Sequence, residues 1–343
     1  MRKLRAVCLL TTIIATAALP AYSQEASKAS VIRWGPNTVE WGFFDASAKP
    51  ILTIKSGDTV SIETPLAGSK EMEDMGLPQD LIRPEMRVLE AGVKDRGAGA
   101  NILVGPIFVE GAEPGDVLEV QILEVTPADN YAVNVFHPGG GALANQFPYF
   151  HARAIPLDNQ RNVAIAGPGI EIPLHPFFGT MGVAPAVAIG RISDGPPGYY
   201  AGNLDNKHLV AGTTLYIPVQ VKGALFSVGD GHAGQGDGEV DGTAIEAALW
   251  GKLRFNVRKD MKLRWPRAET PDSIMTMGFD PDLNLAAEMA VRQMVEYLVS
   301  ERHMLPVDAY VLCSLAVDLQ VTQIVDGVKG VHAMLPKKIF LSK

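Results

Sequence analysis

The chain of 343 residues is poor in cysteine, in positive charge and in long apolar runs. Its 30 Lys and Arg face 38 Asp and Glu, which gives a net charge of −8. This balance disfavours nucleic acids and anionic membrane surfaces as partners, because little positive charge is left to neutralise phosphates. No apolar run has the roughly 20 residues of a transmembrane helix, so we expect a soluble protein without a membrane anchor.

The first 23 residues have the pattern of a signal peptide. Three basic residues within the first five precede an apolar run from Ala6 to Ala18, and the small residues of Ala21-Tyr22-Ser23 follow. This order predicts cleavage before Gln24 and an exported protein, periplasmic or secreted. Removal of residues 1–23 takes away three basic residues and no acidic one, so 27 basic residues would face 38 acidic ones, a net charge of −11.

The nucleophiles of common hydrolases are missing. The sequence has no Gly-x-Ser-x-Gly motif, which weighs against an α/β-hydrolase. Cys313 is the one cysteine left after cleavage, so an intramolecular disulfide is excluded. It lies in the apolar stretch VLCSLAV, a setting that raises the pKa of a thiol. Carboxylate and histidine chemistry remains, with or without a metal ion, and no organic cofactor is expected.

Alternating apolar residues predict strands through much of the chain. Segments 50–65, 109–125 and 208–230 each place a Gly-Asp or Gly-Thr turn before such alternation, which is the pattern of a β-hairpin. We therefore predict a β-sandwich-like domain built of hairpins over residues 24–200.

The remaining residues, 201–343, are predicted to form an α+β domain. Apolar residues recur at helical spacing from Asp280 to Ser300, and Asp280 or Asp282 can cap the first turn. Segment 309–327 begins too apolar for an edge strand and indicates a buried strand, or a helix that leads into a strand. The predicted fold class is mainly β with an α+β C-terminal part.

The segment from Phe226 to Glu246, called the glycine-rich segment below, carries the strongest functional signal. It reads FSVGDGHAGQGDGEVDGTAIE and places five acidic residues, one histidine and one glutamine among six glycines. Such a segment cannot bury apolar surface, and its glycines permit backbone angles that other residues avoid. Because it follows a predicted strand, we expect a site loop mounted on a rigid sheet.

Two pairs of residues in this segment are candidate metal ligands. Asp230 and His232 are two positions apart, as are Asp237 and Glu239, so in an extended loop the side chains of each pair point to one side. One histidine with several carboxylates suits zinc, manganese or calcium. Two alternatives stay open: a metal-free site in which a carboxylate is the general base for water, and a solvated or calcium-stabilised loop.

Further candidates lie outside the glycine-rich segment. His175 precedes Pro176, which fixes the backbone beside the imidazole. Asn203 and Asp205 in AGNLD have short polar side chains that suit substrate binding, and Glu110 is a candidate of the same kind.

These motifs together resemble the acetamidase/formamidase family. The matching stretches lie in order from about residue 50 to residue 337 and include GPIFVEGAEPGDVLEVQIL, HPFFGTMGVAP, AGNLD, GDGHAGQGDGEVDGTAIE and DAYVLCSLAVDLQVTQIVDGVKGVHAMLPK. The resemblance implies hydrolysis of a small linear carboxamide, such as formamide or acetamide, to a carboxylate and ammonia. It also implies a mainly β fold, assembly into homo-oligomers, and a divalent ion such as zinc or calcium.

Carried onto this sequence, the resemblance implies a site made of the residues singled out above. The expected metal ligands are Asp230, His232, Asp237 and Glu239. The expected catalytic residues are Glu239, Asp237, His232, His175 and Asp205, and the expected substrate-binding residues are Asn203, Gln235 and Glu110. We assign activation of water to Glu239 and protonation of the leaving amine to Asp205 or His175.

Two features depart from the family pattern. Many relatives carry a histidine near the position of Asn101, and the better-known members work inside the cell, without export. The alternative function, from another class, is an exported, non-catalytic binding protein that keeps the amidase scaffold and whose acidic loop holds calcium.

Overall fold

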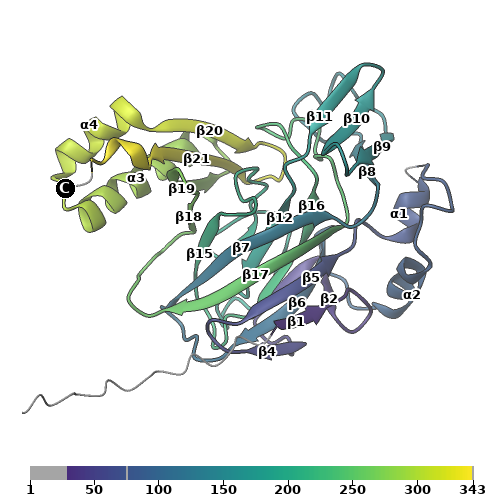
Figure 1. Cartoon of the computed structure of the whole chain (residues 1–343), viewed down its shortest axis with the longest axis horizontal. Coiled ribbons are helices and arrows are strands. Elements are labelled where there is room, and N and C mark those ends of the chain that lie inside the picture. The colour runs from purple at the N-terminus through teal and green to yellow at the C-terminus, as the bar shows by residue number, and fades with distance from the viewer. Residues whose placement is uncertain (1–28, 75, 342–343) are drawn as a thin grey trace, which may run out of the picture.

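The computed structural model describes residues 29–74 and 76–341, so the predicted signal peptide lies outside the described residues (Figure 1). A large sheet has the strand order β1-β5-β17-β7-β15-β18-β19-β21-β20. Its strands are β1 (Ala29–Ile32), β5 (Thr59–Thr64), β7 (Val117–Pro127), β15 (Thr214–Pro218), β17 (Leu249–Arg258), β18 (Arg267–Glu269), β19 (Ser273–Asp280), β20 (Asp318–Gln323) and β21 (Lys329–Pro336).

A second sheet has the order β14-β12-β16-β6-β2, with β4 also paired to β6. Its strands are β2 (Val39–Trp41), β4 (Leu52–Ile54), β6 (Ile102–Val109), β12 (Phe177–Val183), β14 (Ala201–Asn203) and β16 (Phe226–His232). A smaller sheet projects at the upper right of Figure 1 and contains β8 (Tyr131–Phe136), β9 (His151–Asp158), β10 (Val163–Gly167) and β11 (Ile170–Pro173). The ribbon of β3 (Phe43–Asp45) and β13 (Arg191–Ser193) is separate.

The large sheet and the second sheet face each other across one apolar core. Ile62 of β5, Leu103 of β6 and Val228 of β16 are fully buried in the same cluster of apolar side chains. The rings of Phe226 on β16 and Phe255 on β17 meet edge to face with their centroids 5.0 Å apart. This packing of sheet on sheet makes the body of the molecule a sandwich, and the prediction of a mainly β fold is confirmed.

Segments 50–65 and 208–230 each contain two strands, whereas segment 109–125 begins at the last residue of β6 and contains most of β7; in each case the successive strands do not pair with each other. β4 pairs with β6 while β5 pairs with β1 and β17, so segment 50–65 crosses from one sheet to the other. The connections from β6 to β7 and from β15 to β16 cross in the same way. Alternation reports that one face of a strand is buried, and it does not identify the strand's hydrogen-bonded neighbour.

The two predicted domains share their sheets. β5, from the N-terminal segment, pairs with β17 from the C-terminal segment, and β6 pairs in the same way with β16. The boundary near residue 200 therefore stays a prediction.

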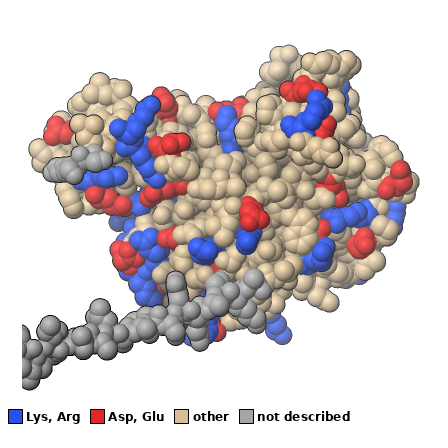
Figure 2. Space-filling view, viewed as in Figure 1, with Lys and Arg blue, Asp and Glu red and all other residues tan. Residues whose placement is uncertain are grey.

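Helices lie on the outside of the sheets. They are α1 (Ser69–Asp74), α2 (Pro84–Gly92), α3 (Leu283–Arg302) and α4 (Pro306–Ala316), and a 3₁₀ turn spans Lys337–Ile339. Among the described residues, no helix combines the length and the apolar character needed to cross a membrane. In the view of Figure 2, acidic and basic side chains are interspersed over the surface.

The predicted C-terminal helix is confirmed as α3. The carboxylate of Asp282 caps it by accepting hydrogen bonds from the backbone N–H groups of Asn284 and Leu285. Met294 is buried against the sheet, which agrees with a packing role. Segment 309–327 is α4 followed by β20, the second of the two alternatives for that segment.

Gly278 on β19 allows the backbone of α3 to lie directly against the sheet. A Cβ atom at this position would overlap the carbonyl oxygen of Ala286 and lie 2.6 Å from the backbone nitrogen of Ala290. We expect Gly278→Ala to lower the free energy of unfolding by about 1–3 kcal/mol, because neither backbone atom can move alone. Urea unfolding measures this change. Gly167→Ala, whose Cβ would meet only Ile170 at 3.7 Å, is the matched control, and equal losses in the two variants would contradict the prediction.

Candidate active site

Four of the nine site residues predicted from the sequence, namely Asn203, Asp205, Asp230 and Glu239, line a cavity of about 250 Å³, called the inner cavity below. One part of its wall is polar and is lined by Asn101, Asn203, Asp205, Asp230, Glu239, Thr243, Glu246 and Asp326. The other part is apolar and is lined by Leu66, Ala67, Ala100, Ile102, Val133 and Val135. The inner cavity therefore offers both acidic and apolar wall to one ligand.

Strand ends and turns bring the acidic residues together. Asp230 and His232 end β16, and Asp205 follows β14 two strands away in the same sheet. Glu246 forms an isolated antiparallel bridge with His232, so the glycine-rich segment folds back on its own strand. Asp326 enters from the turn between β20 and β21 of the large sheet. The cluster is thus assembled from both faces of the sandwich.

His232 is buried, and its orientation is fixed by Gln235. The side-chain amide of Gln235 donates a hydrogen bond of 2.7 Å to the backbone carbonyl of Asp205, and its Oε1 lies 2.9 Å from Nδ1 of His232. An amide oxygen only accepts, so Nδ1 of His232 carries the proton. Nε2 is therefore the ring atom that faces the carboxylates.

Three carboxylates surround Nε2 of His232. It lies 3.2 Å from Glu246 Oε2, 3.4 Å from Asp230 Oδ1 and 3.9 Å from Asp205 Oδ1. Burial alone would lower the pKa of His232, but the carboxylates of Glu246 and Asp230 outweigh burial and raise this pKa well above its usual value. The position of Nε2 therefore demands a positive charge, supplied either by the protonated ring or by a cation bound to it.

Asp205 is fully buried, and only one of its two carboxylate oxygens has a hydrogen-bond partner among the described residues. Its Oδ2 accepts a hydrogen bond of 2.6 Å from the amide of Asn203, while its Oδ1 has no hydrogen-bond partner among the described residues. Burial raises the pKa of Asp205 well above its usual value, and the neighbouring charges of Glu239 and Asp326 raise it further. A buried carboxylate in this state gains from a proton or a cation.

Glu239 and Asp326, like Asp205, each have a buried carboxylate oxygen without a hydrogen-bond partner among the described residues. These atoms are Oε2 of Glu239 and Oδ2 of Asp326. Burial raises the pKa of Glu239 well above its usual value and that of Asp326 to about 6. The polar end of the inner cavity thus holds several oxygen atoms that are free to bind a ligand.

Two overlapping groups of side chains fit a divalent cation. Asp205, His232 and Glu239 form one group, and Asp230, His232 and Glu246 form the other; within each group the ligand atoms lie within 4.8 Å of one another. One imidazole nitrogen with carboxylate oxygens is a donor set for zinc or manganese. Gln235 also supplies the hydrogen bond to the second ring nitrogen that metal-bound histidines usually have.

Asn101 occupies the wall of the inner cavity next to these groups. Its side-chain amide donates to Oδ1 of Asn203 over 3.2 Å and to the hydroxyl of Thr180 over 3.1 Å. Asn203 in turn donates to Asp205. Asn101 therefore orients Asp205 through Asn203.

Three predicted site residues lie away from the cluster. Asp237 forms an ion pair of 2.9 Å with Lys207 and, of the described groups that fit a cation, belongs to neither. The two-residue spacing did not bring Asp237 beside Glu239 because the chain between them is not extended: Gly238 and Glu239 have φ angles of 94° and 45°. His175 and Glu110 are exposed, and neither lines the inner cavity.

Two residues of the cluster received no role from the sequence. Glu246 belongs to the glycine-rich segment, but only the fold-back onto β16 shows that it faces His232. Asp326 lies in a Val-Asp-Gly turn that reads as an ordinary hairpin connection. A carboxylate beside a turn glycine was the available signal in both cases, and such carboxylates are common on protein surfaces.

The sandwich and its buried histidine–carboxylate cluster define a mainly β protein with a group of side chains that could hold a metal ion. The family model described as "Acetamidase/Formamidase family" matches residues 43–195 and 187–342. The chain therefore belongs to the acetamidase/formamidase family.

Comparison with curated relatives gives shorter matches. A formamidase from Methylophilus methylotrophus is 30% identical over 212 residues, covering 46% of this chain and 52% of the relative. An acetamidase from Mycolicibacterium smegmatis is 28% identical over 203 residues, covering 42% of this chain and 50% of the relative. The chain thus spans about half the length of the curated relatives that it matches.

Solved structures match over nearly the full length. A predicted acetamidase/formamidase from Thermoanaerobacter tengcongensis has a TM-score of 0.80 and 29% identity, and covers 92% of this chain and 97% of its own. An acetamidase from Bacillus halodurans has a TM-score of 0.77 and 33% identity, and covers 90% and 98%. The arrangement of sheets is therefore that of the family.

Gly179 on β12 makes room for the cluster. A Cβ atom at this position would lie 2.5 Å from Asp205 Oδ1 and would overlap Asp230 Oδ2. We expect Gly179→Ala to push the two carboxylates apart and to weaken zinc binding about tenfold or more, measured by titration calorimetry. Gly236→Ala, in the same region but with no atom within 4 Å of the added Cβ, is the control. Equal zinc affinities in the two variants would contradict this role of Gly179.

Proposed function

We propose that this protein hydrolyses a carboxamide to a carboxylate and ammonia. The observation that carries the proposal is the set of buried, unpartnered carboxylate oxygens near Nε2 of His232, beside a cavity whose wall is partly apolar. The names of the matched relatives, formamidase and acetamidase, support the same reaction. The signal-peptide pattern of residues 1–23 supports the further proposal that the reaction takes place outside the cytoplasm.

Glu239 is proposed as the general base. Its unpartnered Oε2 is buried at the polar end of the inner cavity, within reach of a water held by the neighbouring carboxylates. As this water forms the new C–O bond with the carbonyl carbon, one of its protons passes to Glu239. When the C–N bond breaks, the same proton passes from Glu239 to the leaving nitrogen. This replaces the assignment of that step to Asp205 or His175, of which His175 is exposed and lies outside the inner cavity. The second proton of the water stays on the new carboxylic acid and then passes to ammonia, so the amide and one water give a carboxylate and ammonium.

His232 and its neighbours are proposed to hold a divalent ion. If Asp230, His232 and Glu246 are the ligands, Glu239 stays free to act on water; if Asp205, His232 and Glu239 are the ligands, it does not. When bound, the ion would polarise the amide carbonyl and lower the pKa of a bound water. Gln235 and Asn203 keep His232 and Asp205 in place for either arrangement.

Replacement of Glu239 by glutamine tests the base. We expect Glu239→Gln to lower kcat for ammonia release about 100-fold or more, because an amide cannot take the proton from water. Zinc affinity, measured in parallel, should stay near that of the parent protein.

Asp237→Asn is the matched control for this variant, since Asp237 lies two residues away and outside the cluster. Full turnover in Glu239→Gln would exclude Glu239 as the general base. A joint loss of turnover and of zinc would instead make Glu239 a ligand.

Removal of the ion tests the metal. We expect a chelator followed by dialysis to abolish ammonia release from acetamide, and zinc to restore it, because the charge that Nε2 of His232 requires would otherwise come from its own proton. Activity that persists without any divalent ion favours the metal-free carboxylate mechanism. An absence of ammonia from every amide tested, together with a higher melting temperature in calcium, favours the non-catalytic binding protein.

A further inference from the structure

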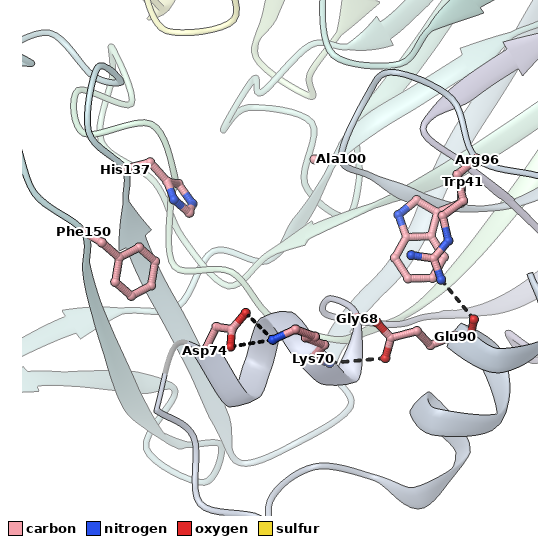
Figure 3. Close-up of a pocket in the computed structure, with 9 residues that line it drawn as sticks. All are labelled: Trp41, Gly68, Lys70, Asp74, Glu90, Arg96, Ala100, His137 and Phe150. Carbon is pink, nitrogen blue, oxygen red and sulfur yellow. Dashed lines mark hydrogen bonds and ion pairs between the residues drawn. The ribbon is translucent and has the colours of Figure 1, made fainter. Parts of the chain in front are cut away.

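A second cavity of about 580 Å³, called the outer cavity below, adjoins the inner cavity. It is lined by Trp41, Gly68, Lys70, Asp74, Glu90, Arg96, Ala100, His137 and Phe150 (Figure 3). Ala100 and His137 also line the inner cavity, so the two cavities share a stretch of wall. A ligand with its amide at the acidic cluster and an extended acyl group would pass from one cavity into the other at these two residues.

The inner cavity alone is larger than acetamide requires. Four heavy atoms, each given the roughly 30 Å³ that a water molecule occupies in the liquid, fill about 120 Å³. The inner cavity has about twice this volume, and its six apolar wall residues offer more apolar surface than the single methyl group of acetamide can cover. Unused apolar wall in a cavity points to a ligand with more apolar surface.

The walls of the outer cavity are aromatic on two opposite sides. Trp41 lies on one side with the guanidinium of Arg96 stacked 3.8 Å from its ring centroid. His137 and Phe150 lie across the cavity, with ring centroids 5.2 Å apart (Figure 3). Because Trp41 is buried under Arg96, a flat apolar group would contact the rings of His137 and Phe150 on one side and the stacked pair of Arg96 and Trp41 on the other.

The charges of the outer cavity compensate one another. Lys70 forms an ion pair of 2.9 Å with Asp74, and Glu90 accepts hydrogen bonds from Ser69 and from the backbone N–H of Lys70. Two cationic and two anionic side chains leave no net charge. A neutral group therefore suits this cavity better than a carboxylate or an amine.

We propose that the substrate is a primary amide whose acyl chain is apolar and ends in an aryl ring, with the amide at the acidic cluster and the ring in the outer cavity. The chain would lie along Leu66, Ile102 and Val133, and the ring between Trp41 and Phe150. This inference rests on the proposed amide hydrolysis. Contacts to the tail act far from the reacting carbon, so they raise kcat/KM through binding energy used in the transition state.

A series of amides tests the proposal with the full-length chain. Ammonia release is measured with acetamide, hexanamide, 5-phenylpentanamide and adipamic acid, the last of which carries an anionic tail. We expect kcat/KM to rise from acetamide to hexanamide and again to 5-phenylpentanamide, each time roughly tenfold, and to fall with adipamic acid. The proposal is overturned if acetamide is the best substrate, or if adipamic acid exceeds hexanamide.

Two variants test whether the acyl chain and its aryl ring bind in the outer cavity. Phe150→Ala removes one aromatic wall, and Ala100→Leu adds bulk where the two cavities adjoin. Each should lower the ratio of kcat/KM for 5-phenylpentanamide to that for acetamide about tenfold, while Val187→Ala, an exposed residue that lines neither cavity, keeps the parent ratio. If the ratio is unchanged in both variants, the aryl ring does not bind in the outer cavity.

The outcomes separate this inference from the proposed function. If acetamide is hydrolysed well and the longer amides are not, the tail site is wrong and amide hydrolysis stands. If none of the amides releases ammonia, amide hydrolysis itself is wrong, and the tail site with it.

Discussion

The need for positive charge at Nε2 of His232 governs the rest of the site. Three carboxylates lie within 4 Å of this buried atom, and like charges at such distances repel strongly where water is excluded. A protonated ring or a bound cation removes that repulsion. The backbone carbonyl of Asp205, the amide of Gln235 and the glycine at position 179 are all arranged around this requirement, since they fix the ring and leave space for the carboxylates.

The sandwich makes such an arrangement possible because it offers rigid strand ends on two sheets. β12, β14 and β16 bring Gly179, Asp205 and His232 together from three neighbouring strands, while the β20–β21 turn adds Asp326 from the opposite sheet. A cluster of buried carboxylates costs stability, so the surrounding core must hold it in place. The apolar side chains of both sheets meet in one continuous core and supply that support.

Sequence reasoning predicted the mainly β fold, the long helix and several residues of the buried cluster, and it failed where the pairing of strands distant in sequence determines the structure. The alternation in segments 50–65 and 109–125 is real, yet those strands cross between sheets, and no local pattern distinguishes a crossing from a hairpin. Asp230 and His232 converge as their spacing predicts, because both lie on β16. Asp237 does not join Glu239, because positive φ angles at Gly238 and Glu239 turn the chain. Asp326 and the outer cavity depend on contacts between distant segments, which spacing alone cannot reveal.

The crossing turns have a consequence for the order in which the molecule is built. Each turn links a strand of one sheet to a strand of the other, so neither sheet is a continuous piece of the chain that can fold ahead of its partner. The acidic cluster draws on residues as far apart as Gly179 and Asp326, and it exists only once both sheets have closed. An ion that binds to this cluster therefore binds the native state and not a partly folded state. Its binding free energy therefore stabilises the native state alone and increases the free energy of unfolding.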